Sequence, residues 1–159
     1  MNFLSNMVAS FEKKLAIVLM FAMAVIVAGS VIFRYVFNQP LVWAGEVSIF
    51  LLIYITFIGG SLGLKHKTQA SVTLLTDKLP ERVNKVVAFI SYLLMLIFMG
   101  VLLFFCAKWI TSPSVAVQKS STLLLPMWIP YSIVPIGLLF ASIHLLNNLL
   151  ILIKEGDKK

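Results

Sequence analysis

Two ionisable residues, Arg34 and Glu46, lie in or beside the long apolar stretches of this sequence. Holding a charge in hydrocarbon costs about 2.5 kcal/mol or more, so an ionisable group at that depth is a candidate for handling ions or protons. A short turn around residues 38–40 separates the two, and an antiparallel hairpin there would bring them within ion-pair distance. Glu46 is therefore either a proton or ion carrier or the partner that neutralises Arg34, and we favour the second interpretation.

Other residues with useful chemistry are scattered. A carrier site near the middle of a membrane needs further polar ligands, and the apolar stretches offer few: Thr56, Ser91, Ser142 and His144. His144 is expected to be a hydrogen-bonded interior or headgroup residue, with Asn147 and Asn148 as candidate partners. Haem ligation by His66 and His144 is disfavoured, because a bis-histidine haem needs both rings at a similar depth.

No catalytic or metal-binding group of residues is visible. The remaining acidic residues are expected in solvated cytoplasmic segments: Glu12, Asp77, Glu81, Glu155 and Asp157. No Ser/His/Asp arrangement or Gly-rich phosphate loop is evident, and the single Cys106 can build neither a disulfide framework nor a metal cluster. We therefore expect no enzyme, no catalytic residue, no metal site and no cofactor.

Composition predicts the elements that position these residues. Of 159 residues, 60% are hydrophobic and only 12% charged, which is more apolar surface than a soluble domain of this size can bury. Crossing about 30 Å of hydrocarbon takes about 20 apolar residues in a helix. The sequence predicts an all-α membrane protein, with one domain and four transmembrane helices at about 15–36, 41–64, 86–110 and 128–153, the last bent near Pro135.

Basic residues predict the orientation of these helices. With four spans, the termini and the middle connection share one side, and only Arg34, Lys108 and Lys119 among the 13 lysines and arginines lie on the other. This bias predicts that both termini are cytoplasmic. The basic residues behind the net charge of +7 thus follow the pattern of membrane anchoring and do not indicate a nucleic-acid partner.

Two shorter segments are predicted to be amphipathic and to lie along the cytoplasmic surface, with membrane lipids as partners. In residues 1–13, Phe3, Met7 and Phe11 share one helical face, and Asn6 and Ser10 lie largely on the other. Residues 68–82 repeat this pattern, and the alternative is that both segments are plain loops. A cleaved signal peptide is the alternative for the first apolar stretch, which is long for that role.

Gly59 and Gly63 form a G-x-x-x-G pattern in the second predicted span, which permits close approach of another helix. Internal packing and contact with a partner subunit are both open interpretations.

The first hairpin resembles a known family motif. It reads Arg34-Tyr35-Val36-Phe37-Asn38, then Pro40-Leu41, Trp43 and Glu46. This is similar to the hairpin of the DctQ-like small subunits of tripartite ATP-independent periplasmic (TRAP) transporters, roughly R-Y-x-F-N followed by W-x-E-E. Gly45 replaces the first acidic residue of that pattern. The resemblance continues through Gly59-Gly60, His66 and Leu79-Pro80.

The resemblance implies a division of labour among three proteins at a bacterial inner membrane. A periplasmic substrate-binding protein captures an organic acid, a large membrane subunit carries it with sodium ions, and the small subunit serves as a scaffold. It also implies that this chain holds no substrate site and that the sodium ions bind the large subunit. Overall likeness favours sialic acid over a C4-dicarboxylate as the substrate.

On this interpretation, two sets of residues carry the contacts of the chain. The hairpin and subunit interface would comprise Arg34, Tyr35, Asn38, Trp43, Glu46, Gly59 and Gly63, with Trp43 anchored at headgroup depth. Lys108 and Lys119 are candidates for contact with the binding protein. The alternatives are a small self-assembling proton-coupled exporter that uses Glu46, and a membrane anchor of a respiratory complex.

Overall fold

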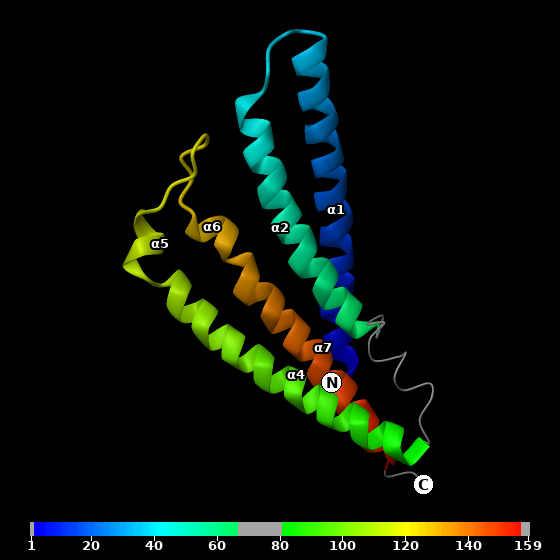
Figure 1. The fold of residues 1–159 in the computed structure, drawn as a ribbon. Helices are drawn as coiled ribbons and strands as arrows, with labels where there is room; N and C mark the ends of the chain where they lie inside the picture. Colours follow the sequence, from blue (N-terminus) through cyan, green and yellow to red (C-terminus); the bar gives the residue numbers. More distant parts are fainter. Residues whose placement is uncertain (1, 67–80, 157–159) are drawn as a thin grey trace.

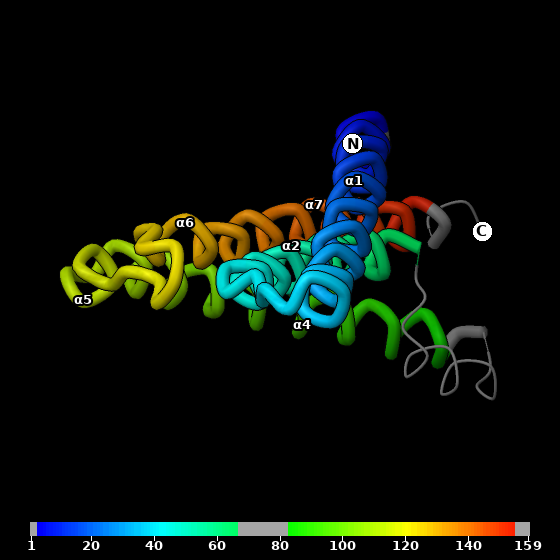
Figure 2. Tube along the Cα trace, turned by 90° about the horizontal axis from the view of Figure 1, so that it is seen from above, coloured from blue at the N-terminus to red at the C-terminus, as the bar shows by residue number. Residues whose placement is uncertain are grey.

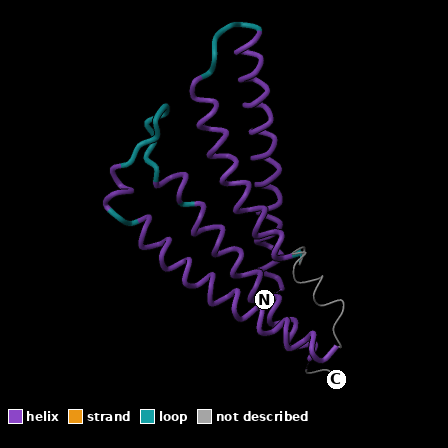
Figure 3. Tube along the Cα trace, in the orientation of Figure 1, coloured by secondary structure: helices purple, strands orange, loops and turns teal. Residues whose placement is uncertain are grey.

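The computed structural model describes residues 2–66 and 81–156, and the elements found there are helices (Figures 1 and 3). They are α1 (Asn2–Tyr35), α2 (Val42–Lys65), α4 (Glu81–Ile110), α5 (Pro113–Val117), α6 (Trp128–Tyr131) and α7 (Ile133–Gly156). Within these ranges, 4 helical stretches are long and apolar enough to cross a membrane: Phe3–Tyr35, Val42–Lys65, Val83–Ile110 and Trp128–Lys154. The predicted all-α fold with four candidate spans is confirmed.

Two helical hairpins make up the fold. α1 packs against α2, α4 packs against α7, and contact between α2 and α7 joins the two pairs, as the view from above also shows (Figure 2). Figure 1 shows the pairs close together near the C-terminal ends of α2 and α7 and diverging toward the α1–α2 turn. We call the end with this turn and with residues 111–127 the loop end, and the opposite end, which carries Lys13, Lys65 and Lys154, the basic end.

The core lies where the two hairpins meet. Leu64 of α2 and Ala141 and Leu145 of α7 are buried together, and side chains of α4 such as Met95 and Met99 pack against them. The most apolar 18-residue windows of α1 and α4, by contrast, contain no buried residue. A surface of this kind is covered by lipid or by a partner protein.

Gly137 marks a close approach of α2 and α7. A Cβ atom built on Gly137 would lie 2.8 Å from Cβ of Phe57, closer than real Cβ atoms come. The corresponding space at Gly59 is open. Gly137, which the sequence does not single out, is therefore a small residue that lets the central helices meet, and Gly59 faces outward.

The first helix is longer than predicted. α1 runs without interruption through 34 residues, so the predicted interfacial segment 1–13 and the predicted first span belong to one helix. The reason is local, because neither glycine nor proline occurs between residues 2 and 28 to end the helix. The other predicted amphipathic segment, 68–82, lies outside the described residues except for its last two, which begin α4.

The fourth span is interrupted at Ser132, between α6 and α7. Pro135 has no N–H to donate, and its ring clashes with the carbonyl group four residues earlier, that of Tyr131. The Ser132 N–H is shared between the carbonyl oxygens of Trp128 and Ile129, at 3.0 and 3.3 Å. The bend expected near Pro135 is thus an interruption just before it.

Candidate interaction site at the loop end

The turn between α1 and α2 is held by its own backbone. The Val36 N–H donates to the Ile32 carbonyl at 2.8 Å, and the Gln39 N–H donates to the Phe33 carbonyl at 3.0 Å. Asn38 has a φ of 52°, in the left-handed region, which asparagine adopts more readily than most residues. Asn38 therefore contributes to the hairpin through its backbone conformation.

Arg34 does not pair with Glu46. Its side chain is exposed on the last turn of α1, and within residues 2–66 and 81–156 no ion pair links it to Glu46. The favoured interpretation of Glu46 as the partner of Arg34 is therefore wrong. The physical reason is that the Glu46 carboxylate has other donors, supplied by the connection between α5 and α6.

Both oxygens of the Glu46 carboxylate accept backbone hydrogen bonds from that connection. Oε1 accepts from the Ser121 N–H at 3.0 Å, and Oε2 accepts from the Thr122 and Leu123 N–H groups at 3.1 and 2.9 Å. Successive N–H groups that converge in this way form a concave anion-binding surface, and hydrogen bonds to an ionised acceptor are stronger than neutral ones. The carboxylate thus joins α2 to a segment about 75 residues away in sequence.

The loop that supplies these donors is itself well ordered by hydrogen bonds. The Ser120 N–H donates to the Leu125 carbonyl at 2.8 Å, and the Leu125 N–H donates back to Ser120 Oγ at 3.1 Å. The Met127 N–H donates to the Gln118 carbonyl at 3.0 Å, beside an isolated bridge between residues 119 and 126. Leu124, with a φ of 54°, turns the chain at the tip. Residues 118–127 therefore form a small closed loop (Figure 1), and the Glu46 carboxylate caps it through the N–H groups of residues 121–123.

A second contact attaches α2 to the same region. The Tyr54 hydroxyl donates to the Ile129 carbonyl of α6 at 3.0 Å, and the rings of Trp109 and Tyr131 lie 4.7 Å apart. Glu46 and Tyr54 are about two helical turns apart on α2. Together they hold the two hairpins in a fixed relation at the end where the hairpins diverge.

The other predicted site residues are placed around this centre without joining it. Tyr35, Trp43, Lys108 and Lys119 are exposed. Lys119 lies within the 118–127 loop that Glu46 caps, whereas Lys108 lies in the last turn of α4. Apart from Glu46, these side chains therefore present themselves outward, where a second protein or lipid could reach them.

A second polar cluster, at the basic end, was missed by the sequence analysis. Ser5 Oγ lies 2.8 Å from Nδ1 of His144, and Glu12 Oε2 lies 2.9 Å from Nε2 of the same ring. The exposed fractions of Ser5, Glu12 and His144 are 1%, 0% and 0%. The placement of Glu12 in a solvated segment was therefore wrong, whereas the prediction that His144 is hydrogen-bonded in the interior is confirmed, with partners on α1.

This arrangement has the residue types of a nucleophilic triad without its accessibility. A serine that acts as a nucleophile needs an open position for the substrate, and the Ser5 hydroxyl is closed off. The neighbouring polar groups are also structural, since Asn148 Nδ2 donates to the Leu64 carbonyl at 3.0 Å and Lys65 Nζ donates to the Ser5 carbonyl at 3.1 Å. The cluster fastens the start of α1 to α7 and α2.

Comparison with known proteins gives a consistent set of matches. A family model described as "Tripartite ATP-independent periplasmic transporters, DctQ component" matches residues 23–155. The chain is similar to the C4-dicarboxylate TRAP transporter small permease protein DctQ of Vibrio cholerae, with 26% identity over 166 residues, which cover 87% of this chain and 69% of that protein.

Two further relatives differ in length and in the substrate that they are named for. The sialic acid TRAP transporter small permease protein SiaQ of Vibrio cholerae is 24% identical over 82 residues, covering 52% of this chain and 47% of that protein. The isethionate TRAP transporter permease protein DctMQ of Oleidesulfovibrio alaskensis is 25% identical over 147 residues, covering 89% of this chain but only 23% of that longer protein.

Proposed function

Because the chain belongs to the DctQ family of tripartite ATP-independent periplasmic transporter components, we propose that it is the supporting subunit of a sodium-coupled organic-acid importer. Small permease proteins of this family are transport components and not enzymes. In the proposed assembly, a large membrane subunit carries the substrate with sodium ions, and a periplasmic binding protein delivers it. The present chain holds the part of the large subunit that stays still during transport.

The hydrogen bonds of the Glu46 carboxylate are the main support for this proposal. A proton- or ion-coupling carboxylate must exchange its ligand during the cycle, near the middle of the membrane. Glu46 instead lies in the second turn of α2, where three backbone N–H groups of the 118–127 loop hold it. Because these hydrogen bonds hold the Glu46 carboxylate on the loop, they favour a scaffold role for the chain over the alternative of a small proton-coupled exporter.

The uncovered apolar faces support a partner in the membrane. α1 and α4 leave long rows of apolar side chains exposed, and Gly59 of α2 has open space around it. The match to only 23% of the longer DctMQ permease is consistent with a small-subunit region that works beside a large one. We propose that part of this apolar surface binds a separate large subunit and that lipid covers the rest.

The proposed orientation places the basic end in the cytoplasm and the loop end in the periplasm, in agreement with the bias of basic residues. The exposed side chains of Tyr35, Lys108 and Lys119 would then lie where a periplasmic binding protein docks. The relatives are named for C4-dicarboxylate, sialic acid and isethionate, so the proposed substrate is an organic acid, with sialic acid preferred over a C4-dicarboxylate.

Uptake by reconstituted liposomes tests the proposal. We expect vesicles that contain this chain alone to accumulate no labelled sialic acid or succinate above protein-free vesicles, with or without a sodium gradient. Adding the large subunit and the binding protein should produce sodium-dependent uptake, because only the assembly holds a substrate site. Uptake of either acid by the isolated chain would contradict the scaffold role, and so would proton-driven efflux that Glu46→Gln abolishes.

A further inference from the structure

A groove lies between α1 and α2 at the basic end of the protein, and it has no role in the function proposed above. Its volume is about 530 Å³, and it is lined by Asn6, Ala9, Ser10 and Lys13 of α1, by Leu62 and Lys65 of α2, and by His66, which directly follows α2. This volume lies within the range of small-molecule binding pockets in proteins. Two ammonium groups and several polar side chains thus share one concave surface, and its lining includes no acidic residue.

Within residues 2–66 and 81–156, no acidic side chain neutralises the positive charge of this groove. In the structure's described ranges, neither Lys13 nor Lys65 forms an ion pair, and Glu12, which follows Phe11 on the same helix, is directed to His144 of α7. Lys65 Nζ is held by two neutral acceptors, the Ser5 carbonyl at 3.1 Å and Asn6 Oδ1 at 2.8 Å. An ammonium group has three N–H donors, so one remains for a ligand.

The polar groove continues into an apolar strip along α1. Residues three, four or seven apart share a helical face, which places Asn6, Ser10 and Lys13 in line with Ile17 and Met20. These two side chains are each 60% exposed. The surface therefore changes from basic to apolar along one helix, in the order in which a phospholipid changes from its phosphate to its acyl chains.

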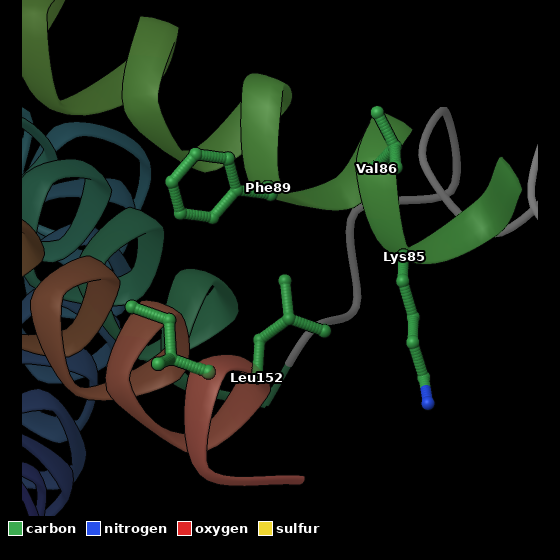
Figure 4. Close-up of a pocket in the computed structure, with 5 residues that line it drawn as sticks. Lys85, Val86, Phe89 and Leu152 are labelled. Carbon is green, nitrogen blue, oxygen red and sulfur yellow. The ribbon is translucent and has the colours of Figure 1, made fainter. Parts of the chain in front are cut away.

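A second groove lies at the same end of the protein, and apolar residues form most of its lining. It has a volume of about 230 Å³, lies between α4 and α7, and is lined by Lys85, Val86, Phe89, Leu152 and Ile153. Figure 4 shows Phe89 and Leu152 projecting toward the space between the helices, while the Lys85 side chain extends away from it. An apolar groove of this kind can hold an acyl chain but offers no cluster of charge for a headgroup.

We propose that the groove between α1 and α2 is a binding site for an anionic phospholipid, whose phosphate lies between Lys13 and Lys65 and whose acyl chains follow Ile17 and Met20. Basic pockets between transmembrane helices are known sites for acidic headgroups. The bound lipid would connect the start of α1 to the end of α2 and supply a negative charge that the described residues lining the groove do not.

Native mass spectrometry of the full chain, purified in detergent, tests this site. The probes are phosphatidylglycerol and phosphatidylcholine with identical acyl chains. We expect phosphatidylglycerol to be retained preferentially, and Lys13→Gln to reduce its retention about fivefold, since one lysine near a headgroup contributes about that factor. Lys13→Arg should restore retention. Lys13 makes no hydrogen bond in the described structure, so these variants should leave the fold intact.

Lys108→Gln is the matched control, because it removes the same charge from an exposed lysine at the loop end, and it should leave retention unchanged. Equal retention of the two lipids, or an equal effect of Lys13→Gln and Lys108→Gln, would overturn the proposal. Displacement of the lipid by millimolar inorganic phosphate would point to a free-anion site instead. If Lys13→Gln weakened binding of the large subunit without changing lipid retention, the groove would hold an acidic protein segment and the proposal would fail. The measurement involves no transport, so its outcome is separate from that of the uptake assay.

Discussion

Each end of this protein contains a glutamate that joins distant parts of the chain, and the two are held in opposite ways. Glu46, at the loop end, binds three backbone N–H groups of an exposed loop. Glu12, at the basic end, is fully buried and faces the side chain of His144. Backbone donors can bind any carboxylate that reaches them, whereas a buried side-chain partner must be matched in position and in proton count. The loop end is therefore held by backbone hydrogen bonds that another carboxylate could also accept, whereas the basic end is held by one specific buried pair of side chains.

The largest effect is expected from breaking the buried contact. Glu12→Ala leaves Nε2 of the His144 ring without a partner in a closed site while Ser5 remains at Nδ1, and removing one member of a buried pair costs about 3 kcal/mol. The free energy of unfolding, measured by titration with sodium dodecyl sulfate and circular dichroism, should fall by that amount. Glu12→Gln keeps a hydrogen-bonding side chain and should cost less. An Ala variant as stable as the parent would remove the distinction between the two ends.

The next effect concerns the helices that connect the two ends. Gly137→Ala puts a methyl group where the Phe57 side chain begins, so α2 and α7 must move apart, at a cost of about 1–3 kcal/mol. Gly59→Ala is the matched control, because the space there is open, and it should be close to neutral in the isolated chain. The same unfolding titration distinguishes them. Equal losses for both variants would mean that the contact at Gly137 does not hold the hairpins together.

The smallest effect on global stability is expected at Glu46. Glu46→Gln removes the charge and presents an amide N–H₂ group to a loop that offers only donors, so the loop loses its cap while the helices remain packed. Amide hydrogen exchange at Ser121, Thr122 and Leu123 should speed up several-fold, with a change in unfolding free energy below that of Glu12→Ala. Glu46→Asp serves as the charge-preserving control. If exchange at the loop did not change in Glu46→Gln, the carboxylate would not be its brace.

The sequence was sufficient for the spans, because hydropathy is a local signal, and an isolated charge within an apolar stretch drew attention to Glu46. It was not sufficient for the partner of Glu46, because backbone N–H groups carry no residue-type signal and those of the 118–127 loop belong to a distant segment. Glu12 was misplaced for a related reason: it precedes Lys13 and Lys14 and looks solvated. Its burial follows only from the spacing of Ser5, Ala9 and Glu12 along one helical face, which is buried in the structure.

The unbroken first helix has a consequence for where the protein meets its surroundings. Its 34 residues extend for about 51 Å, and fitting that length into about 30 Å of hydrocarbon would require a tilt steeper than the 40° or so seen for membrane helices. Residues 15–35 alone already suffice to cross. The first dozen residues then extend beyond the length needed to cross, as a continuation of the same helix, and Glu12 joins them to His144 near the middle of α7. A protein shortened to begin at Leu15 would still cross the bilayer, but it would lose this contact.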